Sequence, residues 1–84
     1  MEFEWDENKN KTNIKKHGID FKDAPAIWKG GLLEIGRNRA HGEERITVVG
    51  TLQGYYVTVI YTERDGSIRL ISARPSNRKE RPHR

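Results

Sequence analysis

The densest group of chemically active side chains is the stretch RNRAHGEER at residues 37–45. It combines three arginines, one histidine and two glutamates, namely Arg37, Arg39, Arg45, His41, Glu43 and Glu44. A carboxylate beside guanidinium groups can act as a general base next to cations that stabilise charge developing on a phosphate. A solvent-exposed loop with local ion pairs fits the same pattern equally well. The stretch is therefore a candidate site whose chemistry needs independent support.

A second basic segment is SIRLISARPSNRKERPHR at residues 67–84, which carries six positive charges and one negative charge. Nine of the ten basic residues after residue 35 are arginines, and arginine binds phosphate through two parallel hydrogen bonds. This bias indicates a nucleic-acid backbone as ligand, although arginine is also a common surface residue.

Metal and cofactor chemistry find little support in the sequence. There is no cysteine, and the three histidines show no metal-ligand spacing. Phosphate-binding glycine loops and nucleophile elbows are also absent. We expect neither a metal nor a cofactor.

The elements that must position the charged residues begin with a short strand at residues 2–5 and a helix between the cap Asp6 and the stop signal Gly18. This helix has almost no apolar stripe, so we expect it on the surface with few contacts. A second helix ends at Gly30, and Pro25 leaves two starts open, Asp20 or Asp23.

From residue 32 the apolar period changes to two, which is typical of strands. Strands are predicted at residues 32–35, 46–52, 55–62 and 67–73. They are separated by a charged loop at residues 36–44 and by the turns Gln53-Gly54 and Asp65-Gly66. The predicted fold class is α+β, in which an N-terminal strand and two helices pack on an antiparallel meander.

Two-residue turns fix which side chains share a face of the sheet. One predicted face is the core face and holds Ile46, Val48, Gly50, Val57, Val59, Tyr61, Ile68 and Leu70. The opposite face places Arg45, Thr62 and Arg69 in one row, which suits either a phosphate backbone or plain solvent. Strand parity puts Arg74 on the core side, where Gly50 would leave room for it.

The 84 residues, with a mean hydropathy of −0.92, predict one small domain. The acidic, polar N-terminus is not a signal peptide, and no apolar run is long enough to span a membrane. We expect a soluble cytoplasmic protein.

The stretches FEWDENKNKTNIKKHGIDFKDA, HGEER and IRLISAR, in this order, resemble the BrnT family of bacterial toxins. The resemblance covers roughly Phe3 to Arg81. It implies a RelE-like fold and one toxin domain over residues 1–84, with a short basic tail at residues 75–84. Related chains continue into a longer helix, whereas Pro75 and Pro82 here allow a turn or two from Ser76.

The resemblance further implies a ribonuclease that inhibits translation and is silenced by a BrnA antitoxin. That antitoxin carries a ribbon-helix-helix domain, so the complex binds operator DNA, and a toxin dimer can sit within a heterotetramer. We expect metal-independent RNA cleavage in which Glu43 or Glu44 deprotonates a ribose 2′-hydroxyl. Arg45 and Arg74 would meet at one phosphate beside the carboxylate. RNA would also contact a basic set: Arg37, Arg39, His41, Arg64, Arg69 and Arg78.

Two other function classes remain open. One is a degenerate toxin that pairs with its antitoxin and represses the operon without cutting RNA. The other is a plain RNA-binding module, which the sequence favours less because the exposed aromatic pattern of RNA-recognition sheets is missing.

Overall fold

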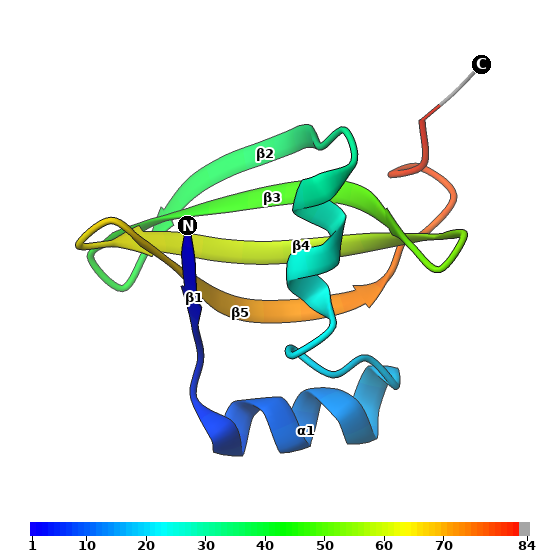
Figure 1. Cartoon of the computed structure of the whole chain (residues 1–84). Coiled ribbons are helices and arrows are strands. Elements are labelled where there is room, and N and C mark those ends of the chain that lie inside the picture. Colours follow the sequence, from blue (N-terminus) through cyan, green and yellow to red (C-terminus); the bar gives the residue numbers. More distant parts are fainter. Residues whose placement is uncertain (83–84) are drawn as a thin grey trace.

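A five-stranded sheet with strand order β1-β5-β4-β3-β2 carries two helical segments in a computed structural model that describes residues 1–82 (Figure 1). The elements in chain order are β1 Glu2–Glu4, α1 Glu7–His17, η1 Ala24–Lys29, β2 Leu33–Ala40, β3 Glu43–Leu52, β4 Tyr55–Arg64 and β5 Ser67–Pro75. Helix η1 crosses one face of the sheet, and α1 runs along its β5 side (Figure 1). The predicted α+β class is confirmed.

The sheet is mixed and not a purely antiparallel meander, because the N-terminal strand joins it in parallel. Strands β2 to β5 pair antiparallel in sequence order, but β1 pairs parallel with β5, with Phe3 opposite Ile68. Parallel strands cannot be joined by a tight hairpin, and here the whole chain from α1 to β4 connects β1 to β5.

Helix α1 has the predicted ends. Asp6 accepts hydrogen bonds from the Asn8 and Lys9 amides, and Gly18 adopts the left-handed conformation with φ of 75°. The expectation of few contacts is wrong, because buried asparagines replace an apolar stripe. The Asn13 amide group bonds both the N–H and the C=O of Ala73, at 3.2 and 2.8 Å. Asn10 bonds Asp20 and the Phe21 amide.

The second helix is a six-residue 3-10 helix with Asp23 at its N-cap and Pro25 in its first turn, so the later start is correct. Asp20 instead accepts hydrogen bonds from Asn10 and from the Lys22 amide. Proline is tolerated at this position because the amides of a first helical turn need no partner within the helix.

The predicted charged loop at residues 36–44 does not exist. β2 continues to Ala40 and β3 begins at Glu43, so His41 and Gly42 alone form the turn, with φ of 53° and 78°. The same positive φ values occur at the predicted turns Gln53-Gly54 and Asp65-Gly66. A charged sequence can form β2 because this strand lies at the edge of the sheet, where its charged side chains pair with those of β3, as Arg37 does with Glu44.

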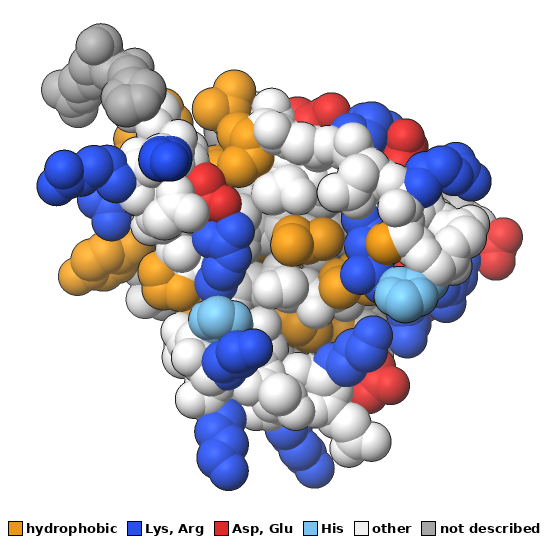
Figure 2. Space-filling view, turned by 180° about the vertical axis from the view of Figure 1, so that it is seen from behind, with side chains coloured by type: hydrophobic (Ala, Val, Ile, Leu, Met, Phe, Trp, Pro, Cys, Tyr) orange, Lys and Arg blue, Asp and Glu red, His pale blue; other side chains and the backbone are white. Residues whose placement is uncertain are grey.

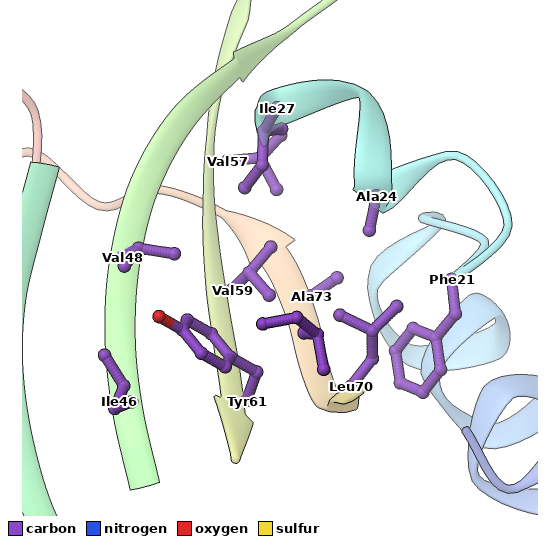
Figure 3. Packing of buried hydrophobic residues seen from close by; sticks show 11 residues of the cluster. Phe21, Ala24, Ile27, Ile46, Val48, Val57, Val59, Tyr61, Leu70 and Ala73 are labelled. Carbon is purple, nitrogen blue, oxygen red and sulfur yellow. The ribbon is translucent and has the colours of Figure 1, made fainter. Parts of the chain in front are cut away.

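The core lies between η1 and the sheet. Phe21, Ala24 and Ile27 pack on the predicted core face, whose apolar residues are all buried (Figure 3). Gly50 makes room for η1 rather than for Arg74, because a Cβ at residue 50 would lie 2.8 Å from the Ile27 Cβ. Trp28 closes the core between Phe3 and Tyr61, with ring centroids 5.0 and 5.3 Å away.

A β-bulge in β5 overturns the predicted position of Arg74. Tyr61 pairs with Leu70 whereas Ile60 pairs with Ser72, so Ile71 is an additional residue without a partner. The bulge reverses the face of every residue that follows it. Ala73 enters the core, and Arg74 lies opposite Thr58 on the face away from η1.

Candidate functional site

The sheet face away from η1, here called the outer face, gathers most of the candidate residues. The strand registers place on it Arg45 and Thr47 of β3, Thr58, Ile60 and Thr62 of β4, and Arg69 and Arg74 of β5. Figure 2 shows this face, where basic side chains border an apolar and neutral centre on several sides. The face combines positive charge with a nearly flat floor, which suits a sugar-phosphate backbone.

The predicted row of Arg45, Thr62 and Arg69 is present at one end of the outer face. Thr62 pairs with Arg69, and Arg45 follows the Ile46–Tyr61 pair, which puts it opposite Thr62. Arg69 forms a 2.7 Å ion pair with Glu4. The Arg45 Nε is buried and has no hydrogen-bond partner within residues 1–82. The Arg45 side chain is 25% exposed and its Nη2 lies 3.8 Å from the Glu43 carboxylate, so its terminal nitrogens are the atoms that an anion can reach.

The two candidate bases lie on opposite sides of β3. Glu43 points to the outer face, 3.1 Å from the Arg64 Nη2 and 3.8 Å from the Arg45 Nη2. Glu44 lies on the other side and is bound by Arg37 at 2.7 Å. Of the two glutamates, Glu43 is therefore the one that shares a face with Arg45.

Arg74 has a carboxylate of its own on the outer face. Its guanidinium forms two 2.6 Å hydrogen bonds with Glu80, which also accepts bonds from Thr58 and from the Asn77 amide. The Arg74 guanidinium, with this amide and hydroxyl, lowers the pKa of Glu80 to about 2. Residues 76–81 thus form a turn that closes on the sheet, as Pro75 and Pro82 predict.

Arg45 and Arg74 do not meet at a single carboxylate, contrary to expectation. They lie opposite Thr62 and Thr58, four residues apart along β4, or about 13 Å at the rise of a strand. Each has its own acidic partner. The outer face therefore holds two arginine centres along one strand direction.

The other predicted RNA contacts are divided among separate surfaces. Arg37 lies on the η1 side between Glu34 and Glu44, and its hydrogen bonds to Glu34 raise the Arg37 pKa. Arg39 also lies on that side, opposite Glu44. His41 is at the tip of the β2–β3 hairpin, and Arg78 is in the exposed C-terminal turn. Of the set, Arg64 and Arg69 share the outer face with Arg45.

Two contributors to the outer face are absent from the predicted site residues. A groove of about 370 Å³ runs between α1 and β5, and Lys9 and Lys16 line it together with Ile71 and Ser72. Tyr56 lies on the same face as Thr58 and is 40% exposed. The alternating pattern of β4 already placed Tyr56 there, whereas the lysines required the position of α1.

The described part of the chain lacks two other features. Within residues 1–82, no three His, Asp or Glu side chains gather closely enough to hold a metal ion. No helix in that range is long and apolar enough to cross a membrane.

The fold is similar to that of a ribonuclease toxin of known structure. The crystal structure of the Brucella abortus ribonuclease toxin BrnT superimposes with a TM-score of 0.74 and 28% sequence identity, covering 93% of this chain and 99% of that chain. The model of the BrnT family, described as the ribonuclease toxin of a type II toxin-antitoxin system, matches residues 5–80. None of the curated proteins matches the chain.

The chain belongs to the BrnT family of ribonuclease toxins. As a toxin of a type II system, it has an antitoxin partner.

Proposed function

We propose that the chain is an endoribonuclease that cleaves RNA without a metal ion, and that cleavage takes place on the outer face at Glu43 and Arg45. The family supports RNA cleavage. The observation that carries the location is that Glu43 lies on the same face as Arg45, Arg64 and Arg69, 3.8 Å from the Arg45 Nη2 and 3.1 Å from the Arg64 Nη2.

In this mechanism Glu43 takes the proton of a ribose 2′-hydroxyl, and the resulting oxygen attacks the adjacent 3′-phosphate. The 5′-oxygen of the next nucleotide leaves and takes up a proton, so that a cyclic phosphate forms. Arg45 stabilises the additional negative charge on the phosphorane oxygens, and Arg69, on the other side of Thr62, adds to the positive charge there. RNA displaces Glu43 from Arg64, and Arg64 then binds a phosphate.

Arg74 remains a candidate for stabilising phosphate charge, but its guanidinium is already bound to Glu80. We therefore assign the main stabilising role to Arg45. Arg74 and Glu80 hold the C-terminal turn in place beside the bound RNA.

The decisive experiment measures cleavage of a labelled RNA by the purified chain in EDTA, with Glu43→Gln and Glu44→Gln as a matched pair. We expect Glu43→Gln to slow cleavage by roughly 10²–10⁴-fold, the contribution of a general base. Glu44→Gln, one residue away on the other side of β3, should cut at close to the unmodified rate. Substitution of the scissile 2′-hydroxyl by hydrogen should abolish cleavage.

Equal rates for the two variants would remove Glu43 from the mechanism, and loss of all cleavage in EDTA would contradict metal independence. Binding of RNA without cleavage by the unmodified chain would instead support the plain RNA-binding module. Circular dichroism of each variant shows whether the fold is intact.

We further propose that the fold is RelE-like and that a BrnA-type antitoxin neutralises the toxin. The ribbon-helix-helix domain of this antitoxin binds operator DNA, and the toxin-antitoxin complex is a heterotetramer. The antitoxin partner of the family and the net charge of +4 support an acidic surface on that antitoxin. Co-expression with the neighbouring antitoxin gene should restore growth, and light scattering of the complex gives its stoichiometry.

A further inference from the structure

A pocket of about 650 Å³ lies at the end of the sheet where the β3–β4 hairpin faces the C-terminal end of α1. The walls that matter for binding come from three segments: His17 from α1, Gln53, Tyr55 and Tyr56 from the hairpin, and Ser76 and Arg81 from the C-terminal turn. None of these residues takes part in the cleavage chemistry described above.

The two tyrosines are unusually exposed for aromatic residues on a sheet. Tyr55 is 76% exposed and Tyr56 is 40% exposed, whereas Phe21 and Tyr61 are buried and Trp28 packs against Phe3 and Tyr61. The Gln53-Gly54 turn, with its positive φ values, places both at the start of β4. The Ser76 amide bonds the Tyr56 carbonyl oxygen at 3.0 Å, which places the C-terminal turn beside Tyr56.

This combination of side chains fits an unpaired nucleobase. Exposed aromatic rings bind the faces of bases in single-stranded RNA, and arginine beside them binds the phosphate. Arg81 and His17 supply positive or hydrogen-bonding groups, and Gln53 offers an amide donor and acceptor to a base edge. Asp20 and Asp23 also line the pocket; Asn10 and the Lys22 amide already bind the Asp20 carboxylate, and Asp23 lies at the N-cap of η1.

Tyr56 joins the pocket to the outer face, whereas Tyr55, the preceding residue on β4, lies on the η1 side. Tyr56 lies six residues before Thr62 on β4, on the same face, which is about 20 Å at the rise of a strand. A few nucleotides of extended RNA span that distance. Arg74 lies between the two ends, opposite Thr58.

We propose that this pocket binds an unpaired base of the same RNA, a few nucleotides from the phosphate at Arg45, and so determines which sequences are cut. The inference rests on the proposed ribonuclease activity and extends it to the class of substrate. The substrate is single-stranded RNA several nucleotides long, and the pocket recognises one base that lies a few nucleotides from the cleaved phosphate.

Binding is tested with the full chain and an eight-nucleotide RNA made entirely of 2′-O-methyl nucleotides, which bind but cannot be cut. We expect Tyr55→Ala and Tyr56→Ala each to weaken binding about tenfold, as loss of one base–aromatic stack does. Tyr55→Phe and Tyr56→Phe should restore it, because stacking needs only the ring. Leu33→Ala, at an exposed apolar residue on β2, is the matched control and should bind normally.

Cleavage of short and long RNA separates this inference from the proposed function. Tyr56→Ala should lose its effect on a dinucleotide that cannot reach the pocket, while Glu43→Gln should impair both substrates. Unchanged affinity in both tyrosine-to-alanine variants would overturn the inference, as would variants that weaken antitoxin binding alone. Absence of cleavage by the unmodified chain, with tyrosine-dependent binding retained, would refute only the ribonuclease mechanism.

Discussion

The guanidinium of Arg74 and the carboxylate of Glu80 lie parallel across two hydrogen bonds of 2.6 Å, and they fasten the C-terminal turn to the outer face of the sheet. Beneath this pair, Thr58 and Ser76 are buried and share a 2.7 Å hydrogen bond. The turn is therefore built as part of the domain, and the bidentate pair is its main attachment.

Glu80→Gln should destabilise the domain. The substitution keeps the size of the side chain but leaves the partly buried Arg74 without its counter-charge, which costs about 2–3 kcal/mol of unfolding free energy. Urea denaturation followed by circular dichroism measures the change. Glu63→Gln is the control, since Glu63 is exposed on β4 and forms no ion pair with any residue from 1 to 82. Equal midpoints for both variants would show that the pair does not hold the turn.

The free energy of unfolding should fall at low pH as Glu80 is protonated. Its pKa is about 2 in the folded chain against 4.5 as the ordinary value, because Arg74 binds the charged form. A lowered folded pKa gives stability that is complete above about pH 4.5 and is lost as the pH falls towards 2. The loss from this group is up to about 3 kcal/mol. Glu80→Gln should flatten that part of the profile, and a profile that is unchanged would contradict the assignment.

Asn13→Ala should weaken the attachment of α1. The side chain bonds both peptide groups of the fully buried Ala73 and the Ile19 carbonyl, and its loss leaves these groups without partners. We expect a cost of about 2–3 kcal/mol in urea denaturation. Asn8→Ala on the exposed side of the same helix should cost less than about 0.5 kcal/mol. Similar costs for the two variants would mean that α1 is held by other contacts.

Gly50→Ala should strain the contact between η1 and β3. The added Cβ would lie 2.8 Å from the Ile27 Cβ and 3.2 Å from Leu32, in a core that has no spare volume. The expected cost is about 1–3 kcal/mol, measured as a lower thermal midpoint. Gly31→Ala, where nothing lies within 4 Å of the new methyl group, is the control and should be neutral. A neutral Gly50→Ala would show that η1 can move away freely.

The sequence alone predicted the elements whose signals are local. Helix α1 has the expected cap Asp6 and stop Gly18, and the turns Gln53-Gly54 and Asp65-Gly66 give the correct register between Thr62 and Arg69. The predicted core face is buried throughout, because alternation along β3, β4 and the first half of β5 is regular. The resemblance to BrnT toxins, which rests on three separate stretches, is confirmed.

The incorrect predictions concern features that local sequence patterns do not encode. Asn13 offers no apolar signal, yet it joins α1 to Ala73, 60 residues away in the sequence. The residues of β2 look like a loop because they are charged. They form a strand nevertheless, because cross-strand and neighbouring ion pairs such as that of Arg37 with Glu44 balance the charges. The bulge at Ile71 has no sequence signal, and it alone moved Arg74 to the outer face.

That bulge makes chain length in β5 as consequential as any side chain. Inserting a single residue between Ser72 and Ala73 would shift the pairing with β4 by one residue, carry the Arg74 guanidinium to the core side and turn Ala73 to the outer face. Deleting the bulged Ile71 would instead straighten the strand and leave both residues on their present faces. A change of length beyond the bulge therefore reverses every face downstream, including that of the turn that carries Glu80. Among related chains, the interval between the last hairpin and the I-S-A-R stretch should therefore vary less than the amino acids that occupy it.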